Sequence, residues 1–400
     1  MKYIVIVPDG MTDLPIESLG GKTPLQAART TNMDYMAQHG MCGMVQTIPQ
    51  GMQPGSDVGN MSLMGYDPLE YHPGRAPLEA ASMNIELQPE EVAFRCNLIT
   101  MSDHVMKDYS AGHIKDKEAN VLIESLSKEI DLPFGKFYAG KSYRHLLVLK
   151  VRDPEAFCTI TTVPPHDILN QDIRDYAPKG PHAEVLISIM ERAYAILQKH
   201  PINDVRIDLK ENPANMIWLW GQGMKPQLPN FKEKFGLTGG VISAVDLVRG
   251  IGKLAGLEII DVPGINGYYD TNYLGKAEYA LKALEKNNFV FIHIEAPDEA
   301  GHNGDIENKI LSLEKIDQDV IGTILNRVDP HDTRILVVAD HPTPVEVRTH
   351  TSEPVNFLMF GKGFEPNGAP DYSEKSCSER DLKFANGEDM LNFFIKKYLD

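Results

Sequence analysis

Three continuous apolar runs in this chain are each followed within a few residues by an aspartate. The runs cover residues 3–7, 289–294 and 335–339, and the aspartates are Asp9, Asp298 and Asp340. Unbroken apolar runs of this kind are typical of parallel strands that are buried on both faces. In an open α/β sheet, the loops after such strands meet at the carboxyl edge, where ligands bind. The pattern therefore predicts an α/β fold with one polar site at that edge.

Four short segments carry residue types that bind divalent metal ions and phosphate. They are Val7-Pro8-Asp9-Gly10, Pro54-Gly55-Ser56-Asp57, Asp298-Glu299-Ala300-Gly301-His302, and Ala339-Asp340-His341-Pro342 followed by His350. Asp298 and His302 are four residues apart, which would place both on one face of a helix. The adjacent Asp340 and His341 would point apart in regular structure, so a turn between two metals would let each side chain bind one ion.

Asp9, Asp298 and Asp340 supply three carboxylates, and His302, His341 and His350 supply three imidazoles. These are enough for two metal sites that keep positions open for a substrate. Mixed carboxylate and imidazole ligation suits Mn²⁺, Zn²⁺ or another first-row ion. Two such ions close together can clamp both the entering and the leaving oxygen of a phosphoryl group. Each residue alone is equally compatible with a solvated surface group. The prediction of a two-metal phosphoryl-transfer enzyme therefore rests on the whole set.

Ser56 is the candidate nucleophile of this site. Pro54-Gly55 favours a turn, and a helix that begins near Asp57 and continues to Met64 would place Ser56 at its N-terminus. There the free N–H groups and the helix dipole favour a negative oxygen or a bound phosphate. A neighbouring metal ion would also lower the pKa of the hydroxyl group. Without the metal-binding residues, Ser56 would be interpreted as a simple N-cap.

The length of 400 residues exceeds one ordinary core and predicts two domains. An alternation of strands and helices covers about the first 75 residues and resumes near Gly240, whereas the intervening stretch is richer in irregular polar loops. We therefore predict a discontinuous metal-binding domain, 1–75 and 236–400, interrupted by an α+β domain over 76–235. Thr23 and Pro24 indicate a helix start, with Gly40 as its stop. A second amphipathic helix is expected over 183–197.

The net charge of −17 argues against nucleic acid and anionic membrane as partners, because no basic excess is available to neutralise phosphates. A small anionic substrate remains compatible, since a local cluster or a metal can reverse the field. The N-terminal sequence does not resemble a signal peptide, and no window approaches a membrane span. The four cysteines are far apart and form no CxxC pair, which favours core thiols and a cytoplasmic protein. The oligomeric state is left open.

Several stretches resemble a known enzyme family over nearly the whole chain. They are Pro8-Asp9-Gly10, Pro54-Gly55-Ser56-Asp57, Gly65-Tyr66-Asp67-Pro68, Gly74-Arg75-x-Pro77-Leu78-Glu79-Ala80 and Asp340-His341-x-Thr343-Pro344. This set resembles the cofactor-independent phosphoglycerate mutases, specifically the shorter, archaeal-type branch within the alkaline phosphatase superfamily. The resemblance implies an alkaline phosphatase-like core with a mostly parallel sheet and an inserted α+β cap domain.

The family resemblance implies an isomerase of glycolysis and gluconeogenesis that interconverts 3-phosphoglycerate and 2-phosphoglycerate through a phosphoserine at Ser56. One metal would be held by Asp9, Ser56, Asp340 and His341, and the other by Asp298, His302 and His350. Mn²⁺ is the expected ion, with Zn²⁺, Co²⁺ or Mg²⁺ as alternatives. The cap would hold the glycerate carboxylate and close over the site, because water would hydrolyse the phosphoserine. Arg75, Arg144 and Lys276 are the candidates for phosphate and carboxylate contacts.

One segment departs from the family pattern and keeps other functions open. Where many archaeal members carry a double arginine, this chain has Asp108-Tyr109-Ser110-Ala111-Gly112-His113, with His113 as the candidate substrate contact. A pocket without two fixed positive charges would attract a phosphoglycerate less strongly. A homoserine kinase-like phosphotransferase on the same scaffold is therefore one alternative. A metal-dependent phosphatase or sulfatase with water as acceptor is another, and a non-enzymatic metal-binding protein is the last.

Overall fold

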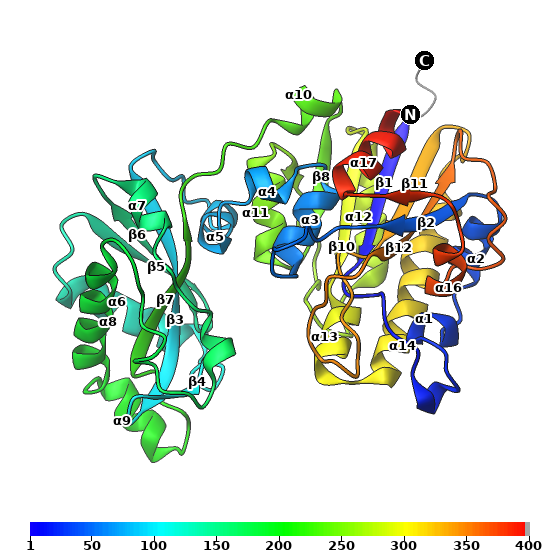
Figure 1. Cartoon of the computed structure of the whole chain (residues 1–400). Coiled ribbons are helices and arrows are strands. Elements are labelled where there is room, and N and C mark those ends of the chain that lie inside the picture. Colours follow the sequence, from blue (N-terminus) through cyan, green and yellow to red (C-terminus); the bar gives the residue numbers. More distant parts are fainter. Residues whose placement is uncertain (397–400) are drawn as a thin grey trace. The chain divides into compact units, whose positions relative to one another are not determined.

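The chain folds into two units, which are described separately from a computed structural model that covers residues 1–396 (Figure 1). Unit 1 consists of residues 1–72 together with the chain from residue 227 onward, and unit 2 consists of residues 73–226. The breaks predicted from the sequence come after residues 75 and 235. Unit 1 contains all four segments that are predicted to bind metal.

Unit 1 is built on an eight-stranded sheet whose central strands run parallel. Strand β12 is the exception, because it runs antiparallel to both β11 and β2. The strand order is β13 (Lys383–Phe384), β2 (Met41–Val45), β12 (Val355–Gly361), β11 (Thr333–Val338), β1 (Lys2–Pro8), β10 (Phe289–Ile294), β8 (Gly239–Ile242) and β9 (Glu258–Ile259). The predicted α/β fold with a mostly parallel sheet is confirmed.

The apolar runs of the sequence form the centre of this sheet. The side chains of residues 4–7 in β1 are completely buried, as are those of 289–294 in β10. Strand β1 lies between β10 and β11 and pairs with both of them in parallel, with Pro8 opposite Ile294 and Ile6 opposite Val337. The loops that follow these three strands therefore emerge at one edge of the sheet.

Helices of unit 1 flank the sheet in two groups whose members pack on one another (Figure 1). One group contains α3 (Ser56–Leu63), α11 (Asp246–Leu254) and α17 (Gly387–Lys396). The other contains α2 (Thr31–Gln38), α12 (Tyr273–Leu284), α14 (Ile306–Lys315) and the π-helical segment η3 (Ile316–Ile321). This arrangement covers the sheet and leaves its carboxyl edge for the loops.

The single helix expected from Thr23 to Gly40 is wrong, because the chain forms two helices there. Thr23 does cap α1 (Pro24–Ala27), with its side chain accepting a hydrogen bond from the Gln26 amide. Ala28 is then extended, and α2 begins at Thr31. The Asp317 carboxylate of η3 accepts hydrogen bonds from the amides of Asn32 and Met33 at 3.1 and 2.7 Å. A capping group that is distant in sequence therefore starts the second helix.

Unit 2 is an antiparallel sheet covered by helices, in agreement with the α+β expectation. Its strands are β3 (Glu91–Ser102), β4 (Val105–Asp108), β5 (Gly135–Lys141), β6 (Arg144–Lys150) and β7 (Met216–Gly223), with β3 between β6 and β7. The helices α6 (Asp116–Glu129) and α8 (Ala183–Leu197) supply buried leucines to its core. The bounds predicted for the second of these helices are confirmed. Among residues 1–396, no helix is long and apolar enough to cross a membrane.

Candidate dinuclear metal site

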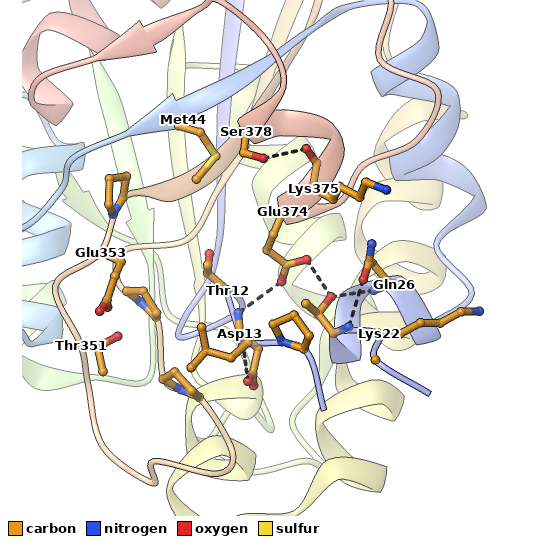
Figure 2. A pocket seen from close by; sticks show the side chains of 17 residues that line it. Thr12, Asp13, Lys22, Gln26, Met44, Thr351, Glu353, Glu374, Lys375 and Ser378 are labelled. Atoms are coloured by element: carbon orange, nitrogen blue, oxygen red, sulfur yellow. Dashed lines mark hydrogen bonds between the residues drawn. The ribbon is translucent and has the colours of Figure 1, made fainter. Parts of the chain in front are cut away.

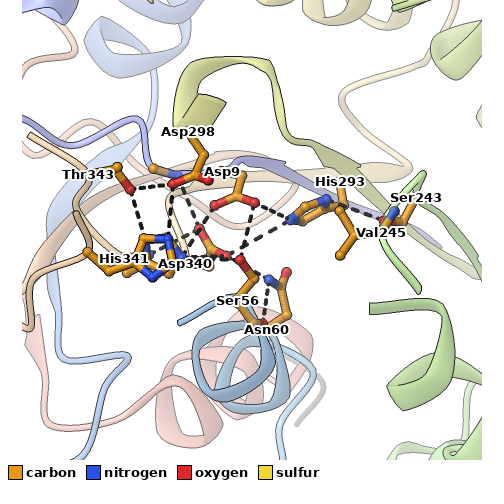
Figure 3. Close-up of polar contacts among 12 residues, drawn as sticks. Asp9, Ser56, Asn60, Ser243, Val245, His293, Asp298, Asp340, His341 and Thr343 are labelled. Carbon is orange, nitrogen blue, oxygen red and sulfur yellow. Dashed lines mark hydrogen bonds and ion pairs between the residues drawn. The ribbon is translucent and has the colours of Figure 1, made fainter. Parts of the chain in front are cut away.

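The carboxyl edge of the unit 1 sheet gathers side chains from four distant parts of the chain (Figure 3). Asp9 follows β1, Asp340 follows β11, and Asp298 lies in the first turn of α13 (Ala296–Asn303), directly after β10. Ser56 is the first residue of α3. The two carboxylates of Asp9 and Asp340 are 1% and 0% exposed, whereas Ser56 is only half-buried. The edge thus combines buried charge with an accessible hydroxyl group.

Asp9, Ser56, Asp340 and His341 form the first cluster of this site. The His341 Nε2 atom lies 3.4 Å from Asp9 Oδ1 and 3.5 Å from Asp340 Oδ2. The Ser56 Oγ atom lies 3.3 Å from His341 Nε2 and 3.4 Å from Asp9 Oδ2. Asp340 is oriented by hydrogen bonds from the Gly10 amide to Oδ1 and from Asn60 Nδ2 to Oδ2. The spacing of the carboxylate and imidazole ligand atoms is suitable for one metal ion.

Asp298, His302 and His350 form the second cluster. The two histidine Nε2 atoms lie 2.9 Å apart, and Asp298 contacts His302 at 3.3 Å and His350 at 3.4 Å. His302 and His350 are 35% and 21% exposed, so this cluster is the open side of the site. The rings of His341 and His350 are centred 4.1 Å apart, which makes the clusters neighbours. All seven predicted metal-binding residues are therefore brought together.

The hydrogen bonds of the second cluster show that it has the right chemistry for a cation. His302 Nδ1 lies 3.1 Å from the Arg348 carbonyl oxygen, and His350 Nδ1 lies 3.3 Å from the Pro54 carbonyl oxygen. Because a carbonyl oxygen only accepts, both Nδ1 atoms carry hydrogen, and the two Nε2 atoms face the cluster. Two lone pairs 2.9 Å apart repel unless a proton or a metal ion lies between them.

The pKa shifts of the site follow from this concentration of charge. Burial, together with the charges of Asp340 and Asp298, raises the pKa of Asp9 well above its usual value. Burial would also raise the pKa of Asp298, but its contacts with His302 and His350 hold that pKa well below its usual value. Burial opposes protonation of His302, yet Asp298 outweighs it and raises the pKa of His302 to about 9. A divalent ion would replace the shared proton and neutralise the carboxylates.

His293 is a residue of this site that the sequence interpretation missed. It lies in β10, is completely buried, and places Nε2 3.1 Å from Asp9 Oδ2 and 3.9 Å from Asp340 Oδ2. Its Nδ1 atom lies 3.3 Å from the Ser243 hydroxyl oxygen. Asp9 Oδ1 and His293 Nε2 are both buried without a well-aligned hydrogen bond, as expected at a metal centre. The available signal was a polar residue inside an apolar strand, which needs a partner when buried.

Lys276, a predicted substrate contact, lies in α12 of unit 1 and is 1% exposed. Its Nζ atom donates a hydrogen bond to the His293 carbonyl oxygen at 2.7 Å. Burial lowers the pKa of Lys276 to about 8, with a partly compensating effect from the charge of Glu295. Lys276 is therefore attached to the same strand that carries His293, directly ahead of Asp298.

The other predicted substrate contacts, Arg75, His113 and Arg144, lie in unit 2. There the guanidinium of Arg75 is centred 5.8 Å from the Trp220 ring, and that of Arg144 is 5.9 Å from the Tyr143 ring. The His113 ring meets the edge of the Tyr143 ring at 6.0 Å, and its side chain is exposed. The structure thus groups these three residues around two aromatic rings.

Arg95 joins this group and was missed in the sequence. Its guanidinium lies 4.3 Å from the Trp220 ring centre and 2.9 Å from Glu79 Oε1. Burial lowers the pKa of Arg95, Glu79 opposes this, and the positive charges of Arg75 and Arg144 lower it further. Arg75, Arg95 and Arg144 together form the arginine cluster of unit 2. No residue spacing in the sequence could have indicated that β3 brings Arg95 beside Trp220.

A cavity of about 600 Å³ is lined by the loops that continue from the metal-binding residues (Figure 2). Thr12 and Asp13 follow Asp9, and the lining also includes Pro342, Pro344 and Thr351. Glu374 accepts hydrogen bonds from the Thr23 hydroxyl and the Asp13 amide across it. None of the seven metal-binding residues lines this cavity. The hydrogen bonds of Glu374 therefore connect the loops that line the cavity, where side-chain packing is incomplete.

Sequence comparison gives matches over nearly the whole chain. A family model described as 2,3-bisphosphoglycerate-independent phosphoglycerate mutase matches residues 37–203. The enzyme of that name from Methanothrix thermoacetophila is 51% identical over 398 residues, which cover 99% of this chain and 100% of the relative.

Structural comparison gives matches to two solved archaeal proteins. A protein from Pyrococcus horikoshii has a TM-score of 0.84 at 28% identity, with 98% of this chain and 96% of that chain covered. The cofactor-independent phosphoglycerate mutase from Thermoplasma acidophilum has a TM-score of 0.67 at 27% identity, with 99% of both chains covered. These similarities extend across both units of the chain.

Proposed function

The chain belongs to the 2,3-bisphosphoglycerate-independent phosphoglycerate mutase family, and we propose that it interconverts 3-phosphoglycerate and 2-phosphoglycerate. The observation that carries the proposal is the position of Ser56. Its hydroxyl lies at the start of α3, within 3.4 Å of Asp9 and His341 from two other loops. A hydroxyl group in this environment is suited to accept a phosphoryl group and return it.

The site residues fit two divalent ions, for which we propose Mn²⁺. One ion would be held by Asp9, Ser56, Asp340 and His341. The other would be held by Asp298, His302 and His350, which contact one another. When bound, the ions supply positive charge that lowers the pKa of the Ser56 hydroxyl and offsets the charge of the phosphate. The buried carboxylates and the histidine Nε2 atoms that face them are the groups that support this assignment.

In the proposed reaction, the Ser56 oxygen bonds to phosphorus while the bond between phosphorus and the C3 oxygen of glycerate breaks. Ser56 loses its proton, and the C3 oxygen takes up one proton. In the second half, the C2 hydroxyl of the same glycerate attacks the phosphoserine and loses its proton, and Ser56 regains one. No co-reactant is consumed. Ser56 can donate its hydroxyl hydrogen to Asp9 Oδ2 or His341 Nε2, which orients the oxygen for attack.

We propose that unit 2 supplies substrate recognition through the arginine cluster. Guanidinium groups bind carboxylate and phosphate in a planar, bidentate manner. Arg75 and Arg144 are the proposed anion contacts, with His113 at the same aromatic group. Arg95 is paired with Glu79 and is assigned to positioning instead. In unit 1, Lys276 is the proposed contact for an anionic group of the substrate.

The alternatives raised by the sequence are not favoured. The relatives from Methanothrix thermoacetophila and Methanosarcina acetivorans, which match over 99% of this chain, are both named as mutases. The segment at residues 108–113 that raised the kinase alternative is a turn held by Asp108, whose carboxylate accepts hydrogen bonds from the amides of Ser110 and Gly112. Ser110 and Ala111 are buried, and only Gly112 and His113 are exposed. We further propose a cytoplasmic enzyme of glycolysis and gluconeogenesis.

Phosphorus NMR of the purified protein with Mn²⁺ and 3-phosphoglycerate, without any nucleotide, tests the proposed function. We expect 2-phosphoglycerate to appear without free phosphate. Release of free phosphate as the main product would identify a phosphatase. No turnover, followed by phosphohomoserine after ATP and homoserine are added, would identify the kinase and overturn the proposal.

A further inference from the structure

Thr343 lies between the two metal clusters and is completely buried (Figure 3). Its Oγ1 atom is 2.5 Å from Asp298 Oδ1, which belongs to the second cluster. The same atom is 3.2 Å from Nδ1 of His341, which belongs to the first cluster. One hydroxyl group therefore contacts a metal-binding residue of each site.

The direction of both hydrogen bonds follows from the chemistry of the partners. An ionised carboxylate only accepts, so the single hydroxyl hydrogen of Thr343 is donated to Asp298. The Thr343 oxygen then has only lone pairs left for His341, and His341 Nδ1 must be the donor. Because a neutral imidazole carries one hydrogen, the Nε2 atom of His341 is left with its lone pair.

This tautomer decides what His341 presents to the first cluster. Its Nε2 lone pair faces Asp9 Oδ1 at 3.4 Å and Asp340 Oδ2 at 3.5 Å, so three electron-rich atoms converge. These three atoms repel one another and together attract a cation. The opposite tautomer would place an N–H between the two carboxylates and would satisfy them without a metal. Of the three predicted metal-binding histidines, His302 and His350 are oriented by main-chain carbonyls. The His341 ring contacts the Thr343 side chain as well as the main chain of Pro342.

The position of Thr343 is fixed by a hydrogen bond to its main chain and by close packing against two glycines. The buried Lys309 ammonium donates to the Thr343 carbonyl oxygen at 2.8 Å and to Asp13 Oδ2 at 2.7 Å. Gly10 and Gly301 approach Thr343 so closely that neither position could carry a larger residue. A Cβ atom at Gly10 would lie 2.5 Å from Thr343 Oγ1, and one at Gly301 would lie 2.3 Å from the Thr343 carbonyl oxygen. The hydroxyl is therefore fixed in place before any ion binds.

We infer that Thr343 is a positioning residue that links the two metal sites: it fixes His341 with Nε2 toward the first ion and holds Asp298 for the second. The inference rests on the metal sites of the proposed function but not on its reaction. Removal of this one hydroxyl weakens metal binding at both sites, although Thr343 binds neither ion. Outer residues of this kind typically change metal affinity by about 10- to 100-fold.

Thr343→Val removes the hydroxyl with little change of shape, and Thr343→Ser is the matched control that keeps it. Mn²⁺ binding to each metal-free protein is measured by titration calorimetry, with elemental analysis of the bound ions. We expect Thr343→Val to bind both ions about 10- to 100-fold more weakly, and Thr343→Ser to stay close to wild type. Weakening at only one site would overturn the link, and wild-type affinity at both would overturn the inference entirely.

Circular dichroism of the metal-free variants checks that each is folded. Should Thr343→Val be unfolded, Thr343→Ala removes the same hydroxyl without a branched side chain and is titrated instead. Because no substrate is present, the result is separate from the proposed reaction. Coupled Mn²⁺ sites without mutase turnover would contradict the proposed function and leave the inference standing. Mutase turnover, combined with Mn²⁺ sites that do not both weaken in Thr343→Val, would support the proposed function and contradict the inference.

Discussion

The metal site of unit 1 and the arginine cluster of unit 2 both concentrate charge, but they hold it in different ways. Asp9, Asp340 and His341 are almost inaccessible, and main-chain amides and neighbouring side chains fix their orientations. In unit 2, Arg75 is half-buried and Arg144 is exposed, and both lie beside aromatic rings. The first arrangement suits chemistry that needs fixed atoms, whereas the second suits recognition of an anion.

This difference indicates that the proposed reaction divides its tasks between the two units. Changes in unit 1 should reduce the metal content or the rate of phosphoryl transfer. Changes in the arginine cluster should weaken substrate binding and leave the metals in place. The following predictions test this division, beginning with the largest expected effect.

Ser56→Ala should remove the proposed nucleophile and reduce turnover to below about one-thousandth of wild type. Because Ala fits at the start of α3, the fold and the metal content should change little. Turnover is followed by phosphorus NMR, and metal content by elemental analysis. Wild-type turnover in the purified variant would show that the phosphoserine mechanism is wrong.

His302→Ala should reduce the bound Mn²⁺ from about two ions per chain to about one, because the second cluster loses one of its three predicted ligands. Elemental analysis after dialysis measures this directly. His331→Ala, which changes an exposed histidine in a turn of the same unit, is the matched control. An unchanged metal content in the first variant would remove His302 from the site.

Arg75→Ala should raise the KM for 3-phosphoglycerate by about 10- to 100-fold, the effect of losing one charge-assisted hydrogen bond. Its metal content should equal that of wild type, in contrast to His302→Ala. Steady-state kinetics with elemental analysis distinguishes the two classes. Arg174→Ala controls for charge, since Arg174 is an exposed arginine of unit 2 that pairs only locally with Asp172. Equal effects of both substitutions would reject the arginine cluster as a substrate site.

The smallest effect concerns His145, a buried residue of β6 in unit 2. Burial lowers the pKa of His145 to about 4. Since the unfolded chain titrates near 6.5, it binds more protons than the folded chain between these values, and stability falls as the pH falls through this window. At pH 5.5 the loss is about 1.4 kcal/mol.

His145→Asn can still accept the hydrogen bond from the Gly140 amide but does not titrate. Urea unfolding at several pH values, followed by tryptophan fluorescence, should show a weaker pH dependence in this variant. Both tryptophans, Trp218 and Trp220, lie in unit 2, so the signal reports on that unit. An identical pH dependence in the two proteins would mean that other groups control the stability of unit 2.

Much of unit 1 was predictable from short patterns. The bounds of β10 match the predicted apolar run, and all seven residues predicted to bind metal meet at the edge where parallel strands end. The helix break after Ala27 was not predictable, because the group that caps α2 is Asp317, far along the chain. His293 and Arg95 were missed for a related reason. Each lies within a strand, where the sequence does not show which polar partner the neighbouring elements will provide.

The α/β class could be predicted from the sequence, because apolar runs are local features. The proposed metal-binding residues could be named in the same way, because they follow those runs closely in the chain. The orientation of these side chains, in contrast, depends on tertiary contacts. The tautomer of His341 depends on the Thr343 hydroxyl, and the position of Thr343 depends on Lys309 and on the space left by Gly10 and Gly301. Hydrogen-bond direction and close packing arise between segments that are distant in the chain, and no local pattern records them.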